Sequence, residues 1–368
     1  MTVLRHTDPM RRWLMAGAAL CFAIGMAELA LGQQLNGTPP IVQAPASPIK
    51  PHLVSSFNVP AATNMFGPMV EVELMSGSQP NALALDGRDG AIWFSAPSLG
   101  SLGRIDPDGK TITYTYLGKR TKPWGLAFGP DNSLFATDKV LNVLHRIDGI
   151  SGELTRIAMP PELQLLDLSG LRVDAHGRIW FAGAAGWLGH FNPKNGQVDV
   201  SSHDDLPGLS YATAGDDGAI WFLSGRAARM IRIDPVRKRF DSTTLPEGFR
   251  GARGLSAGRN GEVWVSSGKT NAIARFAGRG TWKVANLPWP ESRPHAILMR
   301  RDGSLIIADG GRRMLVRYLP DLDLFEDIAP LGSGGAIKSI IETRTGIAYA
   351  DVGGDDVRLF NDTPAVQN

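Results

Sequence analysis

Short apolar runs separated by turn residues recur along most of the chain, and the whole pattern repeats seven times. Each repeat has a tight-turn pair followed at once by a strand-like apolar run, as in Asp89-Gly90-Ala91-Ile92-Trp93-Phe94. The second turn residues lie at positions 90, 132, 177, 218, 261, 303 and 346, so the spacings are 42, 45, 41, 43, 42 and 43 residues. Strand-like units at this period, with no helical periodicity, predict an all-β protein, a seven-bladed β-propeller.

The second repeat shows how one unit divides into strands. Apolar runs occupy residues 124–128, 134–137, 143–147 and 154–158, and a Gly-Pro-Asp-Asn turn separates the first two. Asp-Gly and Asn-Gly pairs supply the positive φ angles that tight hairpins need. We therefore predict blades of four antiparallel strands, with the first strand of each repeat innermost.

The two ends of the repeat region complement each other. The seventh repeat stops after its third strand, at residues 357–360, whereas residues 70–74 alternate as Val-Glu-Val-Glu-Leu before the first repeat. We predict that this N-terminal segment pairs into the last blade as its missing strand. Such closure removes two open sheet edges.

Two recurring residue types are predicted to be structural. Tryptophan recurs at one repeat position, as Trp93, Trp180, Trp221 and Trp264, and large aromatic side chains dominate the packing between sheets. A residue shared by nearly all blades cannot mark a single site, so we expect the recurring arginines to make charged contacts between blades or at the outer rim. These arginines, with His190 at the matching place in the third repeat, are Arg104, Arg146, Arg232, Arg275, Arg317 and Arg358.

The N-terminal region predicts export. Arg11-Arg12 precede an apolar run over residues 13–27, and small residues before Gln33 fit a cleavage site. The basic pair is also compatible with a twin-arginine signal. We interpret residues 1–32 as a signal peptide, 33–65 as a Pro-rich linker, 66–362 as the propeller and 363–368 as a tail. The expected location is periplasmic or secreted, and the alternative is an uncleaved membrane anchor, which would make the membrane a partner.

Charge and cysteine content narrow the chemistry. The chain has 38 Lys and Arg against 36 Asp and Glu, so no charge excess favours a nucleic-acid partner. Its single cysteine, Cys21, lies in the predicted signal, which leaves no disulfide and no thiolate chemistry in the mature protein. We expect a monomer.

The repeat positions that differ between blades predict where a site lies. Inner strands line the channel of a propeller, and a single asymmetric site requires positions that are not repeated. The expected ring at the start of the inner strands is Asn81, Trp124, Ser169, Ser210, Arg253, His295 and Lys338. A second ring after the second strands is Ala96, Asp138, Gly183, Ser224, Ser267, Asp309 and Val352, with Asp351 beside the last.

Within these rings, His295 and Asp309 form the sharpest pair, because they belong to adjacent strands of one blade. An imidazole near a carboxylate can act as a general base. Both types also bind metal ions, and Asp309 and Asp138 are the candidate oxygen ligands for Mg²⁺. The alternative is a hydrogen-bonded channel lining with no chemistry.

Basic residues dominate the same predicted face. The candidate ligand-binding residues are Arg253, Arg293, Lys338, Lys122 and Trp124. Because arginine offers a planar fork to carboxylate or phosphate, we predict a small-molecule or peptide-like ligand with anionic or carbonyl groups at the channel mouth. The alternative is a set of solvated charges around that mouth.

The repeat resembles the virginiamycin B lyase (streptogramin lyase) family over residues 66–360. The motifs that carry the resemblance are residues 89–95 (Asp-Gly-Ala-Ile-Trp-Phe-Ser) with 103–107 (Gly-Arg-Ile-Asp-Pro), residues 122–128 (Lys-Pro-Trp-Gly-Leu-Ala-Phe), and residues 217–222 with 231–235. The resemblance implies elimination that opens a cyclic depsipeptide at an ester, with Mg²⁺ polarising the carbonyl next to the proton that is removed.

The resemblance also implies roles for single residues. Pro294-His295 matches the element that holds the family's catalytic histidine, and Asp309 stands where the family has glutamate. Arg253 and Arg293 stand at two positions where the family has an acid or histidine, and permanent cations repel Mg²⁺. A non-catalytic ligand-binding or scaffold propeller therefore stays open as the alternative. A gluconolactonase-like metal hydrolase is less favoured, since the repeat count is seven.

Overall fold

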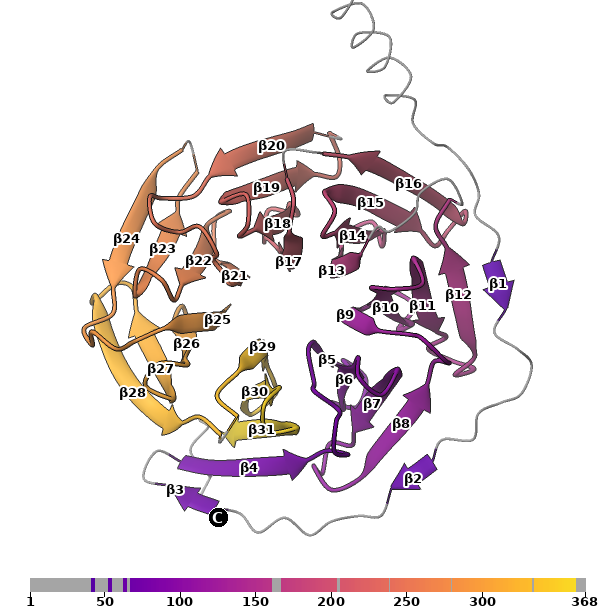
Figure 1. The fold of residues 1–368 in the computed structure, drawn as a ribbon, viewed down its shortest axis with the longest axis horizontal. Coiled ribbons are helices and arrows are strands. Elements are labelled where there is room, and N and C mark those ends of the chain that lie inside the picture. Colours follow the sequence, from indigo (N-terminus) through magenta and orange to yellow (C-terminus); the bar gives the residue numbers. More distant parts are fainter. Residues whose placement is uncertain are drawn as a thin grey trace, which may run out of the picture.

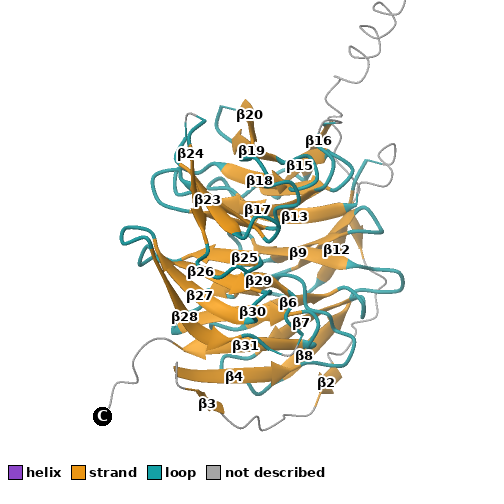
Figure 2. Cartoon of the chain, turned by 60° about the vertical axis from the view of Figure 1, so that its left-hand side comes forward, coloured by secondary structure: helices purple, strands orange, loops and turns teal. Residues whose placement is uncertain are grey.

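Seven twisted antiparallel sheets are arranged radially around a central axis in the computed structural model (Figure 1). The structure describes residues 67–361 except 161–166, 204–205, 238, 279 and 333, together with three short strands before residue 65. All regular elements in these ranges are strands, and loops gather at the strand ends (Figure 2). The predicted seven-bladed β-propeller is confirmed.

Each blade is a meander of consecutive strands, innermost first. Blade 1 contains β5 (Leu83–Leu85), β6 (Ile92–Ala96), β7 (Ser101–Ile105) and β8 (Ile112–Tyr116). Blade 2 contains β9 (Pro123–Phe128), β10 (Leu134–Asp138), β11 (Val143–Ile147) and β12 (Leu154–Ala158). Blade 3 contains β13 (Leu168–Val173), β14 (Ile179–Gly183), β15 (Trp187–Asn192) and β16 (Gln197–Ser202).

Blades 4 to 6 follow the same order. Blade 4 contains β17 (Leu209–Ala214), β18 (Ile220–Ser224), β19 (Arg229–Asp234) and β20 (Arg239–Thr244). Blade 5 contains β21 (Gly254–Ala257), β22 (Val263–Ser267), β23 (Ala272–Phe276) and β24 (Trp282–Asn286). Blade 6 contains β25 (Pro294–Met299), β26 (Leu305–Asp309), β27 (Met314–Leu319) and β28 (Leu324–Pro330).

Blade 7 joins the two ends of the propeller, as predicted. Its inner strands β29 (Ile337–Glu342), β30 (Gly346–Asp351) and β31 (Asp356–Asn361) come from the end of the chain, and its outer strand β4 (Gly67–Glu73) precedes blade 1. Val72 lies opposite Val357 and Val70 opposite Leu359 in the antiparallel register. The alternation of residues 70–74 thus places Val72 in the apolar core and Glu73 towards solvent.

Three further short strands pair with outer strands of neighbouring blades. β1 (Ile41–Gln43) pairs with β12, β2 (His52–Val54) with β8, and β3 (Ala62–Asn64) with β4, so parts of the predicted linker run along the outside of the ring (Figure 1). The predicted signal peptide, residues 1–32, and the tail, 363–368, lie outside the described residues. No helix long and apolar enough to cross a membrane is found in the described part of the chain.

The recurring tryptophans pack between blades, as predicted. Trp180, Trp221 and Trp264 are 4%, 1% and 3% exposed, whereas Trp93 is half-buried. Trp221 of blade 4 packs with Phe276 of blade 5, and Trp264 packs with Tyr318 of blade 6. Each of these indole rings therefore packs at the interface with the following blade and offers no surface to a ligand.

The recurring arginines do make charged contacts, but within single blades rather than between blades. Arg104 pairs with Asp89 at 2.5 Å and Arg232 with Asp217 at 2.7 Å. The reason is register: Arg104 lies directly opposite Trp93 on β6, so its guanidinium reaches the turn that opens that strand. His190, opposite Trp180, instead pairs with Asp199 at 3.2 Å.

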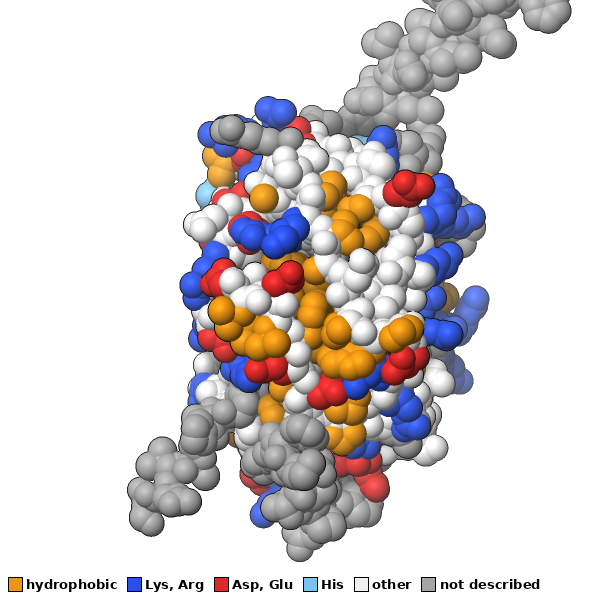
Figure 3. All heavy atoms as spheres, turned by 90° about the vertical axis from the view of Figure 1, so that its left-hand side faces the viewer, with side chains coloured by type: hydrophobic (Ala, Val, Ile, Leu, Met, Phe, Trp, Pro, Cys, Tyr) orange, Lys and Arg blue, Asp and Glu red, His pale blue; other side chains and the backbone are white. Residues whose placement is uncertain are grey.

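The outer side of the ring carries apolar side chains among charged ones. Val284 on β24 and Leu324 on β28 are 46% and 43% exposed. Figure 3 views this side and shows orange patches interrupted by Lys, Arg, Asp and Glu. The cavities on the axis and at the channel mouth are lined by inner strands and loops, not by this outer side.

Candidate functional site

A cavity of about 170 Å³ lies on the propeller axis and is lined by the inner strands. Six of the seven positions expected at the start of the inner strands line it, and the seventh, His295, lines two adjoining cavities instead. The six are Asn81, Trp124, Ser169, Ser210, Arg253 and Lys338.

The axial cavity is cationic. Its lining includes Arg172, Arg253 and Lys338, and none of its described lining residues is Asp or Glu. Burial lowers the pKa of Lys338 from its ordinary value, and the nearby charges of Arg253 and Lys139 lower it further. Like charges held together away from bulk water favour the entry of an anion, since an opposite charge stabilises each of them.

A second, larger cavity of about 980 Å³ lies between blades 5 and 6 at the channel mouth. Arg253, Lys269, Arg293 and His295 line it, with Glu291 as its one described acidic lining residue. Arg253 lines both cavities, so the two form one continuous cationic surface from the loops to the axis.

The His295 imidazole lies between two glycines. A Cβ atom built on Gly268 or on Gly310 would lie 3.4 Å from its ring, at the close end of ordinary van der Waals contact, so both glycines pack closely beside the imidazole. Among the described residues the ring nitrogens have no hydrogen-bond partner. Burial, then the charges of Arg253 and Lys338, lower the pKa of His295 below its ordinary value of 6.5. The ring is therefore neutral at neutral pH and can accept a proton or a hydrogen bond.

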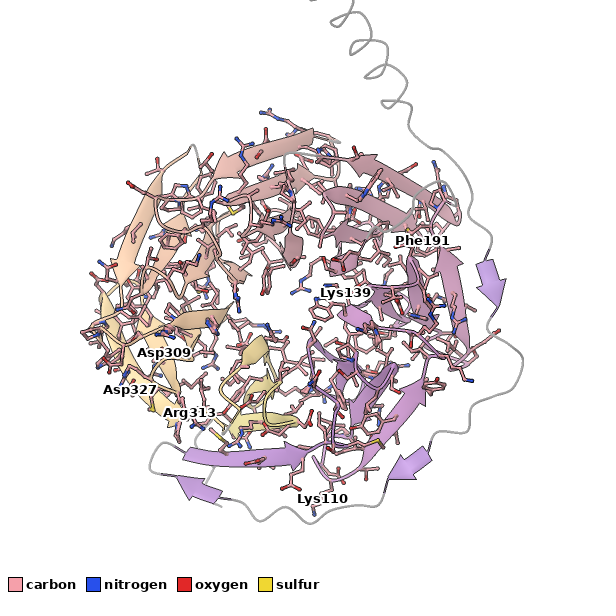
Figure 4. All side chains as sticks on the ribbon, viewed as in Figure 1. Lys110, Lys139, Phe191, Asp309, Arg313 and Asp327 are labelled. Carbon is pink, nitrogen blue, oxygen red and sulfur yellow. The ribbon has the colours of Figure 1, made fainter. Side chains whose placement is uncertain are left out.

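Asp309 does not face the channel, contrary to the sequence-based expectation. Its side chain is fully buried inside blade 6 (Figure 4), and Oδ1 accepts hydrogen bonds from the backbone N–H groups of Arg293 at 2.7 Å and Gly311 at 3.1 Å. The carboxylate satisfies the hairpin that follows β26, and no hydrogen bond joins it to His295. The proposed catalytic role of this pair stays a prediction.

Asp138 is buried in the same way in blade 2. Its carboxylate accepts hydrogen bonds from the backbone N–H groups of Lys122, Val140 and Leu141, and from Nε2 of His145 at 3.0 Å. Asp351 repeats the arrangement in blade 7. These positions form a structural element that recurs in some blades, and sequence position alone did not distinguish it from a channel lining.

The candidate metal ligands do not fit Mg²⁺. Asp138 and Asp309 belong to blades 2 and 6, which are not neighbours. Both oxygens of Asp138 and Oδ1 of Asp309 accept hydrogen bonds inside their own blades, whereas Oδ2 of Asp309 is buried without a hydrogen-bond partner. No group of three or more His, Cys, Asp or Glu side chains suited to a metal occurs among the described residues. The accessible surface near His295 is cationic, whereas Mg²⁺ needs oxygen ligands that offset its charge.

Of the other predicted ligand-binding residues, Trp124 and Arg293 line a cavity and Lys122 does not. Trp124 lines the axial cavity, and Lys139 Nζ lies 4.2 Å from the centroid of its ring, beside the axis (Figure 4). Arg293 is exposed and lines the larger cavity. Lys122 is exposed but lines neither cavity, and it contributes its backbone N–H to Asp138 instead.

The sequence-based prediction omitted two cations that line these cavities, Arg172 and Lys269. It also omitted Lys139, which lies over Trp124 and pairs with Asp167 at 3.1 Å. For Arg172 a signal was present. Arg172 lies on the inner strand of its blade, directly opposite Trp180 of the second strand. At this inner-strand position the other six blades have uncharged residues. These are Ala84, Ala127, Thr213, Ser256, Leu298 and Ile340.

The architecture defines the chain as a seven-bladed β-propeller, and comparison with known proteins shows where this fold recurs. No family model matches the chain, and no curated protein matches it. A catalytically inactive virginiamycin B lyase from Staphylococcus aureus, solved with quinupristin, is similar at 21% identity and a TM-score of 0.69, covering 79% of this chain and 97% of that one.

Two further solved structures are similar. A streptogramin B lyase matches at 19% identity and a TM-score of 0.69, covering 79% of this chain and 96% of its own. A hydrazine synthase from Kuenenia stuttgartiensis matches at 15% identity and a TM-score of 0.63, covering 78% and 97%. Proteins of such different names share the fold, so at these identities the likeness shows the fold alone.

Proposed function

We propose that this propeller binds a small-molecule or peptide-like ligand through an anionic group at the channel mouth, between Arg253, Lys338 and His295. The observation that carries the proposal is a concave site lined by arginine and lysine, with no acid among the described residues of the axial cavity. Arginine can hold carboxylate or phosphate through two parallel hydrogen bonds, and such charge-assisted bonds are about twice as strong as neutral ones. We further propose that the protein acts as an exported monomer.

Replacing Arg253 tests this proposal. Arg253→Gln is expected to weaken binding of inorganic phosphate and of acetate at least tenfold in isothermal titration calorimetry, because it removes the charge shared by both cavities. Arg301→Gln is the matched control, since the Arg301 side chain is 92% exposed and lines neither cavity. Equal affinities for wild type and Arg253→Gln would contradict the proposal, as would an equal loss in Arg301→Gln.

A second candidate function is elimination at an ester, with His295 as the base. The observation that favours it is a neutral, accessible imidazole without a hydrogen-bond partner among the described residues. In this step His295 takes the proton next to a carbonyl, the electron pair forms a carbon–carbon double bond, and the ester oxygen leaves as a carboxylate. Arg253 and Arg293 would stabilise the negative charge that develops on the oxygens, and we assign no step to Mg²⁺.

The candidate elimination predicts linearisation of a streptogramin B by the purified protein, followed by mass spectrometry. Elimination leaves the mass of the substrate unchanged, whereas hydrolysis adds one water molecule. His295→Ala is expected to reduce the rate at least a hundredfold, while the exposed control Arg301→Gln, beyond the other end of β25, leaves it unchanged. If the wild-type protein at high concentration leaves the cyclic substrate intact, the elimination is rejected and the binding function is unaffected.

A further inference from the structure

Arg172 is a single arginine placed within the central channel. It lies on β13, three residues after Ser169 at the mouth, which is about 10 Å further along an extended strand. Its side chain lines the axial cavity together with Arg253 and Lys338. The six equivalent positions carry no charge, so Arg172 makes an otherwise symmetric channel asymmetric.

No acid pairs with Arg172 among the described residues. Its one hydrogen bond runs from Nη1 to the backbone carbonyl oxygen of the adjacent Leu171, at 2.7 Å. Burial lowers the pKa of Arg172 to about 10, and no neighbouring charge offsets this effect. A half-buried cation without a counter-charge is unfavourable, and other arginines of this propeller, such as Arg104 and Arg232, have carboxylate partners.

Arg172 is also separate from the cations at the mouth. Arg172 lies three residues further along its inner strand than Ser169, whereas Arg253 and Lys338 occupy the position of Ser169 in their own blades. The cavity therefore has two cationic positions. Its lining also includes the apolar residues Leu126, Leu255 and Ile340.

We propose that the axial cavity binds a short linear dicarboxylate end-on, with one carboxylate at Arg172 and the other at Arg253 and Lys338. This inference rests on the proposed binding function and names the chemical class of its ligand. A dicarboxylate has two anionic ends joined by an aliphatic chain. The ends match the two cationic positions, and the chain matches the apolar part of the cavity lining. A single anion could satisfy only one of the two positions.

The test is a calorimetric series of dicarboxylates of increasing length, from malonate to adipate, each compared with the monocarboxylate of the same chain length. In the wild-type protein the best dicarboxylate is expected to bind at least tenfold more tightly than its monocarboxylate. Arg172→Gln is expected to remove this advantage while leaving monocarboxylate affinity unchanged. Arg253→Gln is expected to weaken both, and Arg301→Gln neither.

The outcomes separate the two proposals. If Arg253→Gln weakens binding but Arg172→Gln leaves dicarboxylate affinity unchanged, the mouth site stands and the end-on dicarboxylate is overturned. If no carboxylate binds, or Arg253→Gln has no effect, both are overturned. Thermal unfolding without ligand provides an internal check of folding. Arg172→Gln is expected to melt no lower than wild type, because it removes a half-buried charge that has no acidic partner among the described residues. Arg172→Lys should retain part of the dicarboxylate preference.

Discussion

Deletion of residues 66–76 is expected to abolish the single cooperative unfolding transition of the propeller, or to lower its midpoint by more than about 10 °C. The segment contains β4, the outer strand of blade 7, and its residues Met69 and Val72 are 4% and 1% exposed in two different core clusters. Without this strand both clusters are opened to water and the edge of β31 loses its partner. Differential scanning calorimetry measures the effect directly.

A point substitution tests the same closure with less disruption. Val72→Asp buries an unpaired carboxylate between blades 7 and 1 and is expected to lower the free energy of unfolding by roughly 3 kcal/mol or more. Val236→Asp is its matched control, because Val236 is 73% exposed, and a change within about 0.5 kcal/mol is expected there. A deletion variant that unfolds at the wild-type temperature would show that β4 does not close the ring.

The architecture could be predicted from the sequence because every blade repeats the same local information. One run such as residues 143–147 is too short to identify a strand alone, but seven turn-plus-strand units at one spacing reinforce each other. The third and fourth strands of blade 2 begin and end where the hydrophobic pattern places them, at Val143–Ile147 and Leu154–Ala158. Closure of the ring could be predicted because residues 70–74 alternate like a strand before the first repeat, whereas the seventh repeat lacks its fourth strand.

The site could be predicted only in part, because a residue's place in the repeat does not fix the direction of its side chain. The ring positions were right for Arg253 and Lys338, which line the axial cavity. For Asp309 the deciding factor is three backbone N–H groups of its own hairpin region, which bind Oδ1 and hold the carboxylate in a fully buried position. The positions of these backbone N–H donors depend on the turn geometry, which cannot be read from the residue type at one repeat position.

The opposite error concerns Arg172. Arg172 lies outside the two predicted rings, although it is the one charged residue at the inner-strand position that faces the recurring aromatic residue. A repeat protein thus permits a simple search for function: each structural position is compared around the ring, and an isolated charge among small or apolar residues is examined first.

Asp138→Ala is expected to lower the free energy of unfolding by about 3–5 kcal/mol at pH 7, as measured by urea denaturation. The substitution leaves the N–H groups of Lys122, Val140 and Leu141 and the buried His145 without their acceptor. Asp138→Asn retains part of the acceptor and should lose less. Asp108→Ala is the matched control, because Asp108 is an exposed turn aspartate that accepts one backbone hydrogen bond, from Lys110.

The contribution of Asp138 should also depend on pH in a defined direction. Burial alone would raise the pKa of Asp138, but the hydrogen bonds from His145 and the backbone amides lower it below its ordinary value of 3.8. A depressed folded-state pKa means that the stabilisation is present above pH 3.8 and is lost as the pH falls through the lower folded value. The difference between wild type and Asp138→Ala should therefore shrink in strong acid. A metal-ligand role would instead predict that Mg²⁺ raises the unfolding midpoint of wild type alone, with little difference between the two proteins in its absence.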